Sequence, residues 1–146
     1  MNKYYEHWKN NPCERDPIFY QTLDLLNKKP AKILEIGGAR NLDPRSKAGD
    51  GYSSIFFADY CRNYGGHLTN VELDAGNLEN CKIITEDFKD IITYINEDGL
   101  KFLENNKDFD FIYLDAGDDP NITLQMFEKC DRKKSWIFVD DANMPN

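Results

Sequence analysis

The sequence predicts an α/β protein built on a doubly wound parallel sheet with helices on both faces. Short apolar runs of strand length alternate along the chain with segments that carry the apolar spacing of amphipathic helices. Such alternation gives parallel strands joined by right-handed crossovers. A glycine-containing loop follows the first predicted strand, and acids lie at or just beyond the ends of all five. We therefore expect a ligand site at the carboxyl ends of the strands.

Each predicted strand is a short run of apolar or β-branched residues. The expected strands are residues 32–36, 67–74, 91–96, 109–115 and 135–141. The predicted helices are bounded by proline and glycine: Pro17 suits a first helical turn, and Gly65 ends the second helix. The expected helices are residues 17–28, 53–64, 75–88, 100–105 and 122–130. Residues 1–16 lack a clean period and are expected to form an arm that packs over the domain or covers the site.

Length and composition restrict the class of protein. With 146 residues, 40% of them hydrophobic, the chain is expected to form a single domain, residues 1–146. A net charge of −8 with scattered bases argues against a nucleic-acid partner and favours small molecules. We see no signal core and no apolar run of the roughly 18 residues that a membrane span needs, so a cytoplasmic location is expected. The four cysteines have no C-x-x-C spacing and are expected to be reduced.

The loop after the first strand is the predicted start of the ligand site. Gly37, Gly38 and Gly51 let the backbone approach a ligand closely, and a helix starting at Ser53 presents partial positive charge. Glu35, beside this loop, would repel phosphates but attract a cationic ligand group, or fix the loop through backbone N–H bonds. No G-x-G-x-x-G pattern is present. These features favour a cofactor with an amino-acid tail and a positive sulfur over a pyrophosphate cofactor.

The acids after the second and third strands suit the nucleoside part of such a cofactor. Glu72 offers two coplanar oxygens that would accept from both ribose hydroxyls. Asp98 is placed to accept from an exocyclic amino group of the base. For any single acid, capping of the following helix is the alternative explanation.

Five short motifs occur in a fixed order along residues 30–141. They are Ile33–Gly37, Gly51–Ser53, Val71–Asp74, Glu97–Leu103 and Phe109–Gly117. In order and spacing they resemble the class I S-adenosylmethionine-dependent methyltransferases, most closely the small-molecule O-methyltransferase branch. The resemblance implies a Rossmann-like fold with strand order 3-2-1-4-5. The two further strands that usually follow the fifth are absent from these 146 residues.

The resemblance also implies functions for individual residues. Gly37 and Ser53 would hold the methionine part of S-adenosylmethionine, Glu72 the ribose and Asp98 the adenine. Asp115 would lie next to the methyl donor and is the candidate catalytic residue. The implied function is methyl transfer from S-adenosylmethionine to a hydroxyl of a small-molecule acceptor.

A divalent cation is implied by the same resemblance. Asp115, Asp140 and Asp141 match the places where catechol-type relatives bind a metal, with an acid where an amide is usual. Their oxygen ligands would suit Mg²⁺ or Mn²⁺, which would lower the pKa of the acceptor hydroxyl and orient it. The lysine that serves as general base in those relatives is absent after Asp115, where the sequence continues Ala116-Gly117-Asp118-Asp119.

Two alternatives to a methyltransferase remain, and one question of assembly. The first alternative is a cofactor-binding module that has no transfer activity or that needs a partner to complete its fold. An NAD-dependent oxidoreductase is disfavoured by Glu35 and by the missing G-x-G-x-x-G pattern. The fifth strand would be an exposed edge with apolar residues, so we expect either a homodimer or an arm that covers this edge.

Overall fold

The computed structural model describes residues 1–47, 52–115, 117 and 119–140. Its strands are β1 (Ala31–Ile36), β2 (Gly66–Glu72), β3 (Ile92–Asn96), β4 (Phe111–Leu114) and β5 (Trp136–Val139). Its helices are α1 (Lys3–Asn10), α2 (Asp16–Leu25), α4 (Ser53–Tyr64), α5 (Ala75–Ile84), α6 (Gly99–Asn105) and α7 (Pro120–Lys129). Two short 3₁₀ helices are η1 (Pro44–Ser46) and η2 (Glu86–Phe88).

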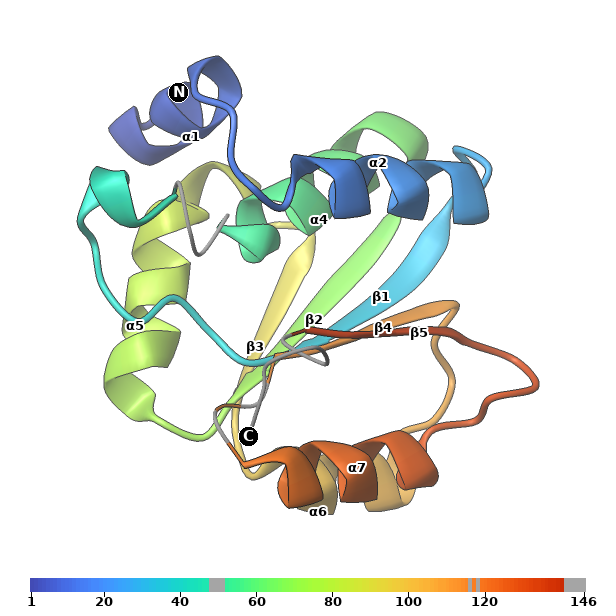
Figure 1. The fold of residues 1–146 in the computed structure, drawn as a ribbon. Coiled ribbons are helices and arrows are strands. Elements are labelled where there is room, and N and C mark those ends of the chain that lie inside the picture. The colour runs from blue at the N-terminus through green and yellow to red at the C-terminus, as the bar shows by residue number, and fades with distance from the viewer. Residues whose placement is uncertain (48–51, 116, 118, 141–146) are drawn as a thin grey trace.

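The five strands form one parallel sheet in the order β3-β2-β1-β4-β5. Figure 1 shows α2 and α4 on one face of this sheet and α6 and α7 on the other. The predicted fold class and strand order are therefore confirmed. Parallel pairing brings the carboxyl ends of all five strands to the same end of the molecule.

Several observed elements are shorter than predicted, for a local reason. The predicted second strand ends at Glu72 rather than at residue 74, because the Asp74 side chain accepts from the Asn77 N–H and caps α5. The predicted helix 75–88 is interrupted at Thr85. The buried Thr85 hydroxyl donates to the Cys81 carbonyl and also contacts the Tyr94 hydroxyl, so it competes with the helical backbone bonds.

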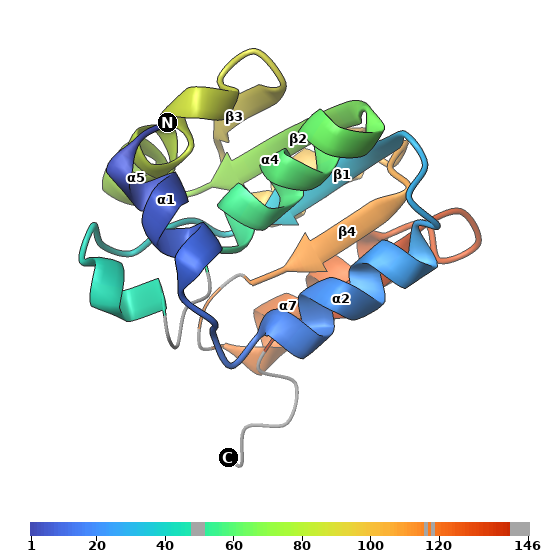
Figure 2. The ribbon, with the colours of Figure 1, turned by 90° about the horizontal axis from the view of Figure 1, so that it is seen from above.

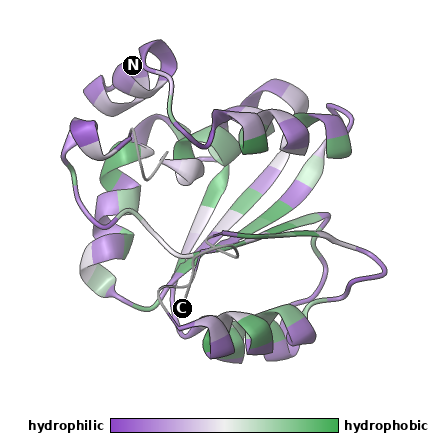
Figure 3. Ribbon diagram, in the orientation of Figure 1, coloured by the Kyte–Doolittle hydropathy of each residue, from purple (hydrophilic) through white to green (hydrophobic). Residues whose placement is uncertain are grey.

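The two faces of the sheet have different cores. On the α2–α4 face, the fully buried Phe57 ring contacts the rings of Phe19, Phe56, Phe111 and Tyr113. On the α6–α7 face the buried cluster is mainly aliphatic and includes side chains from β1, β2 and β4. Figure 3 shows the hydrophobic colour concentrated on the strands and on parts of the helices, with mainly hydrophilic connecting loops. Both faces fix the strands rigidly, so the carboxyl ends are a stable frame for a site.

The N-terminal arm, residues 1–16, contains a helix that was not predicted. Asn2 caps α1 by accepting from the N–H groups of Tyr4 and Tyr5. The Tyr5 hydroxyl donates to Asp59 at 2.6 Å, and its ring packs edge-on against Phe88. Figure 2 shows α1 beside α4 and α5. The arm thus packs over the domain as expected; its helix escaped prediction because only Tyr4 and Tyr5 of its eight residues are buried.

Strand β5 is the edge of the sheet on the side away from β3, as predicted. Its first residue, Trp136, is 54% exposed. The arm helix α1 packs against α4 and η2 rather than along this strand, so covering of the edge by α1 is not observed. The homodimer stays a prediction. Throughout the described ranges, no helix is long and apolar enough to cross a membrane.

Candidate functional site

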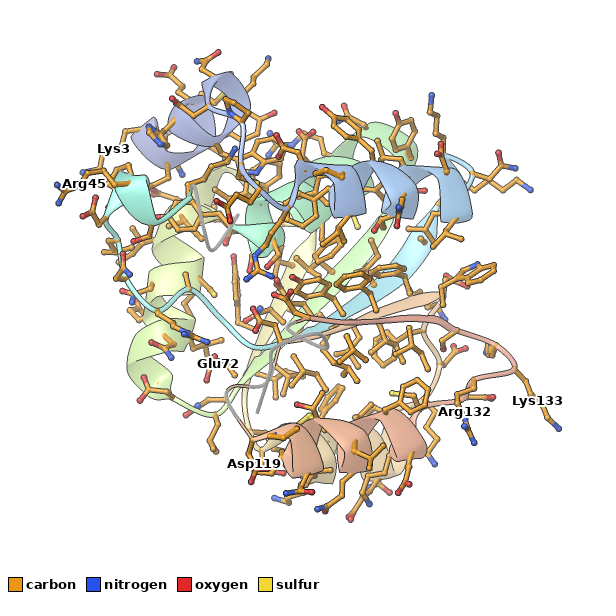
Figure 4. All side chains as sticks on the ribbon, viewed as in Figure 1. Lys3, Arg45, Glu72, Asp119, Arg132 and Lys133 are labelled. Atoms are coloured by element: carbon orange, nitrogen blue, oxygen red, sulfur yellow. The ribbon has the colours of Figure 1, made fainter. Side chains whose placement is uncertain are left out.

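A cavity of about 390 Å³ lies at the carboxyl ends of the strands. Its walls come from the ends of β1, β2 and β4 and from the starts of α5, α6 and α7. The lining residues are Ile36, Gly37, Gly38, Arg40, Val71, Glu72, Leu73, Asp74, Asn77, Asp98, Gly99, Asp115, Gly117, Ile122 and Met126. Figure 4 shows Glu72 at this end of the molecule and Arg132 and Lys133 at the opposite end. The position agrees with the expected ligand site of a parallel α/β sheet.

The structure brings most of the predicted cofactor residues to this cavity. Gly37, Gly38, Glu72, Asp98 and Asp115 all line it. A smaller adjoining cavity of about 120 Å³ shares part of this lining. Ser53 lines that smaller cavity, whereas Gly51 lies outside the described residues. Their individual roles stay predictions.

Of the two glycines after β1, Gly37 is sterically required and Gly38 has close side-chain neighbours. Gly37 has φ +120°, and a Cβ there would lie 2.1 Å from the Asp115 carbonyl oxygen. At Gly38 a Cβ would lie 2.8 Å from Glu72 Oε2 and 3.1 Å from Cys81 Sγ. Because glycine has no Cβ, the loop can pass this close to β4 and to Glu72. The loop backbone therefore forms a wall of the cavity.

Glu72 is held at the end of β2 with its carboxylate at the cavity. Its Oε1 accepts from the Asp74 N–H at 2.8 Å, and Oε2 lies beside Gly38. Partial burial raises the pKa of Glu72, and the negative charges of Asp74 and Asp115 raise it further. The backbone bonds fix the side chain without neutralising it, which suits a carboxylate that accepts hydrogen bonds from ligand hydroxyls.

Three aspartates at this end cap helices. Asp74 caps α5, Asp98 caps α6 and Asp119 caps α7, each by accepting a backbone N–H bond at 2.9 to 3.0 Å through Oδ1. Capping therefore accounts for part of their placement. Asp74 and Asp98 also line the cavity. Since the cap occupies one oxygen, the second oxygen of each remains for a ligand.

Glu35 lies behind the site rather than in its wall. It is 2% exposed, and its carboxylate accepts from Ser53 Oγ at 2.5 Å, Ser54 Oγ at 2.6 Å and Asn70 Nδ2 at 2.8 Å. Asn70 also donates to the Gly37 carbonyl, so the network joins the loop to the start of α4. Burial raises the pKa of Glu35 to about 7 despite these three hydrogen bonds. Of the two functions predicted for Glu35, the structure shows the fixing of the loop, through side chains rather than backbone N–H groups. Glu35 lines neither cavity, and its contact with the ligand stays a prediction.

Two apolar residues at the cavity were missed by the sequence analysis. Leu73 is 68% exposed and Ile122 is 37% exposed, and both line the cavity. Exposed aliphatic side chains at a cavity rim offer apolar surface to a flat ring. The signal in the sequence was an apolar residue placed directly after Glu72, where a strand had been expected to continue.

The predicted metal residues are engaged differently. Asp140 Oδ2 accepts from the Tyr113 hydroxyl at 2.9 Å and pairs with the Arg15 guanidinium. The Asp140 side chain is only 5% exposed. Over the described ranges, we find no group of three or more His, Cys, Asp or Glu side chains arranged to hold a metal ion, and Asp141 lies outside those ranges. The described residues therefore do not support the predicted metal.

Comparison with known proteins gave no match to any family model and none to the curated proteins. Solved structures do match. A caffeoyl-CoA O-methyltransferase-like protein from Staphylococcus aureus is 26% identical over 86% of this chain, with a TM-score of 0.58. A SAM-dependent methyltransferase from Geobacter sulfurreducens, in complex with S-adenosyl-L-homocysteine, is 15% identical over 95% of this chain, with a TM-score of 0.58. The N-methyltransferase NodS from Bradyrhizobium japonicum, also with S-adenosyl-L-homocysteine, is 18% identical over 88%, with a TM-score of 0.54.

The fold of the chain is similar to that of class I S-adenosylmethionine-dependent methyltransferases. This confirms the resemblance found in the sequence motifs. The chain spans 55% of the length of the S. aureus and G. sulfurreducens proteins and 66% of NodS.

Proposed function

We propose that the chain binds S-adenosylmethionine in the 390 Å³ cavity and transfers its methyl group to a hydroxyl of a small molecule. The observation that carries the proposal is the placement of Glu72 and Asp98 around one cavity whose wall is the Gly37–Gly38 loop. In this arrangement Glu72 accepts from the ribose hydroxyls and Asp98 from the adenine amino group, while Leu73 and Ile122 supply apolar surface for the adenine ring.

The charges at the cavity favour this cofactor over a dinucleotide. Among its described lining residues, four are carboxylates and one, Arg40, is a base. Such a lining repels a pyrophosphate, which is doubly negative, but attracts the sulfonium and amino groups of S-adenosylmethionine. Asp115 lines both cavities, which places it where the two adjoin. The Ser53 hydroxyl donates to Glu35, so the backbone N–H groups at the start of α4 are the donors for the methionine carboxylate.

On the acceptor side, Asp115 is the candidate base. It would take the proton of the acceptor hydroxyl as the oxygen attacks the methyl carbon and the carbon–sulfur bond breaks. The cofactor supplies the methyl group as a sulfonium and leaves as S-adenosylhomocysteine. The support for a hydroxyl acceptor is the 26% identity to a protein named for O-methyl transfer.

Calorimetry with S-adenosylhomocysteine tests the binding half of the proposal. We expect saturable one-to-one binding, because the product shares all the nucleoside contacts of the cofactor. Absence of binding by the unmutated protein, under conditions where circular dichroism shows it folded, would overturn the proposed function.

Binding without activity is the second candidate function. It is favoured by the sequence after Asp115, Ala116-Gly117-Asp118-Asp119, which lacks the lysine that serves as general base in catechol-type relatives. Radiolabelled methyl transfer to a panel of small phenols, carboxylates and amines separates the two. If the protein binds S-adenosylhomocysteine but methylates neither a compound of the panel nor a component of a small-molecule extract, it is a binding module.

A further inference from the structure

We propose that the Arg15 guanidinium takes the place of a divalent metal at the ends of β4 and β5. We call this part of the molecule the acceptor side. The inference rests on the proposed function only in that an acceptor is expected to bind on this side. Its experiment does not, because it measures metal binding without cofactor or acceptor.

The carboxylates at this position need a positive charge nearby. Asp115 and Asp140 follow the neighbouring strands β4 and β5, and the Asp140 carboxylate is almost fully buried. Asp115 is half-buried, but a buried acid such as Asp140 is costly unless a cation or a proton relieves it. A metal ion is one form of relief, and a guanidinium is another.

The contacts of Asp140 identify the guanidinium as the form used. Arg15 Nη1 pairs with Asp140 Oδ2, and the same oxygen accepts from the Tyr113 hydroxyl. Two donors on one oxygen leave it poorly available to a metal, and the fixed positive charge of arginine repels a divalent cation at the same carboxylate. Arginine keeps its charge at all accessible pH values, so this relief is permanent.

Arg15 is also placed to act on a ligand. Its side chain is 19% exposed, and it lines the smaller cavity together with Ser53 and Asp115. Arg15 lies in the N-terminal arm directly before α2, so the arm places a positive charge at the end of β5. A guanidinium in this wall stabilises an anionic oxygen, as a bound metal would.

Titration of Mn²⁺ into the unmutated protein tests the proposal, followed by the electron paramagnetic resonance of free Mn²⁺ and by the melting temperature. We expect no loss of the free Mn²⁺ signal and no saturable rise in melting temperature up to about 1 mM. Removal of the charge in Arg15→Ala should lower the melting temperature and create Mn²⁺ binding that saturates, since the buried Asp140 carboxylate then loses its guanidinium partner. The double variant Arg15→Ala/Asp140→Asn should lose that binding.

Two controls separate this from a general loss of structure. Arg40→Ala removes an exposed arginine that lines the same small cavity and should behave like the unmutated protein. Arg15→Lys keeps a positive charge and should not gain Mn²⁺ binding. Saturable Mn²⁺ binding by the unmutated protein that Asp140→Asn abolishes would overturn the proposal. If Arg15→Ala does not fold, this measurement on the unmutated protein still decides the question.

Discussion

The two halves of the carboxyl end of the sheet hold their acids in different ways. At β2 and β3, Glu72 and Asp98 are fixed by backbone N–H groups only two and three residues further along the chain. At β5, Asp140 is fixed by Tyr113 from the neighbouring strand and by Arg15, which is 125 residues away in sequence. Contacts local in sequence therefore hold the acids of the first half, and tertiary contacts hold the acid of the second. Local contacts leave one carboxylate oxygen of each acid open to a ligand, whereas the tertiary contacts pair Asp140 with a cation.

Gly37 is the point at which the two halves meet, and its substitution should have the largest effect. Gly37→Ala adds a Cβ 2.1 Å from the Asp115 carbonyl oxygen at a φ of +120°. Backbone strain and overpacking together should lower the free energy of unfolding by about 2–5 kcal/mol. Urea denaturation measures this loss.

Gly117→Ala is the matched control for that substitution. Gly117 also has a positive φ, +95°, but no heavy atom lies within 4 Å of a Cβ built there. It should lose only the strain, about 1–2 kcal/mol. Equal losses in the two variants would show that the close approach of Gly37 to β4 is unimportant.

Glu35, behind the cofactor half, should make stability depend on pH. The folded protein releases the Glu35 proton at about pH 7, whereas an ordinary glutamate releases it at 4.5. Between these values the folded state holds more protons than the unfolded state, so stability falls as pH rises through this window, by about 3 kcal/mol in all.

Glu35→Gln should remove that part of the pH dependence, because the amide does not titrate. Urea midpoints at pH 5 and pH 8 measure it. The control is Glu79→Gln, which changes an exposed acid on α5 and should keep the full slope. A slope unchanged in Glu35→Gln would mean that Glu35 titrates normally in the folded protein.

Glu72 tests whether the cofactor half binds the nucleoside. Glu72→Ala should weaken S-adenosylhomocysteine binding by about 1.5–3 kcal/mol, the range for hydrogen bonds to a charged group. Calorimetry measures the change. Glu97→Ala is the control, since Glu97 follows β3 but pairs with Lys101 and does not line the cavity. Comparable losses in both variants would point to net charge rather than to a specific contact.

The same contrast between local and tertiary contacts explains what the sequence could predict. The parallel α/β sheet, the glycine loop and the convergence of Glu72 and Asp98 followed from periodicity and from the rule that ligands lie at the carboxyl ends of parallel strands. The strand order was implied by the resemblance to a known family. Glu35 was predicted to meet the ligand, because a sequence does not show that Ser53, Ser54 and Asn70 would enclose its side chain.

The contacts of Asp140 at the end of β5 could not be predicted from the sequence, for a related reason. Asp140 was grouped with Asp115 and Asp141 because the three residues match the metal-binding positions of catechol-type relatives. The partner that decides its chemistry is Arg15, in a segment that carried no recognisable pattern. The helix of the N-terminal arm was missed on the same ground, since its burial depends on contacts with α4 and η2.

Asp98 offers the finest test of the comparison, because it serves as a helix cap and as a candidate ligand for the adenine at once. Asp98→Ala should lose the cap and cost about 0.5–2 kcal/mol of stability. Asp98→Asn should keep the cap, because asparagine caps as well as aspartate, so its urea midpoint should match that of the unmutated protein.

The two functions of Asp98 then separate in calorimetry. In Asp98→Asn the amide oxygen caps α6, which leaves an NH₂ group facing the adenine amino group, so a hydrogen bond is lost. S-adenosylhomocysteine binding should weaken by about 0.5–1.5 kcal/mol, the usual contribution of one hydrogen bond and less than the loss in Glu72→Ala. If Asp98→Asn binds as tightly as the unmutated protein, Asp98 is a cap alone, and recognition of the base falls to the apolar side chains of Leu73 and Ile122.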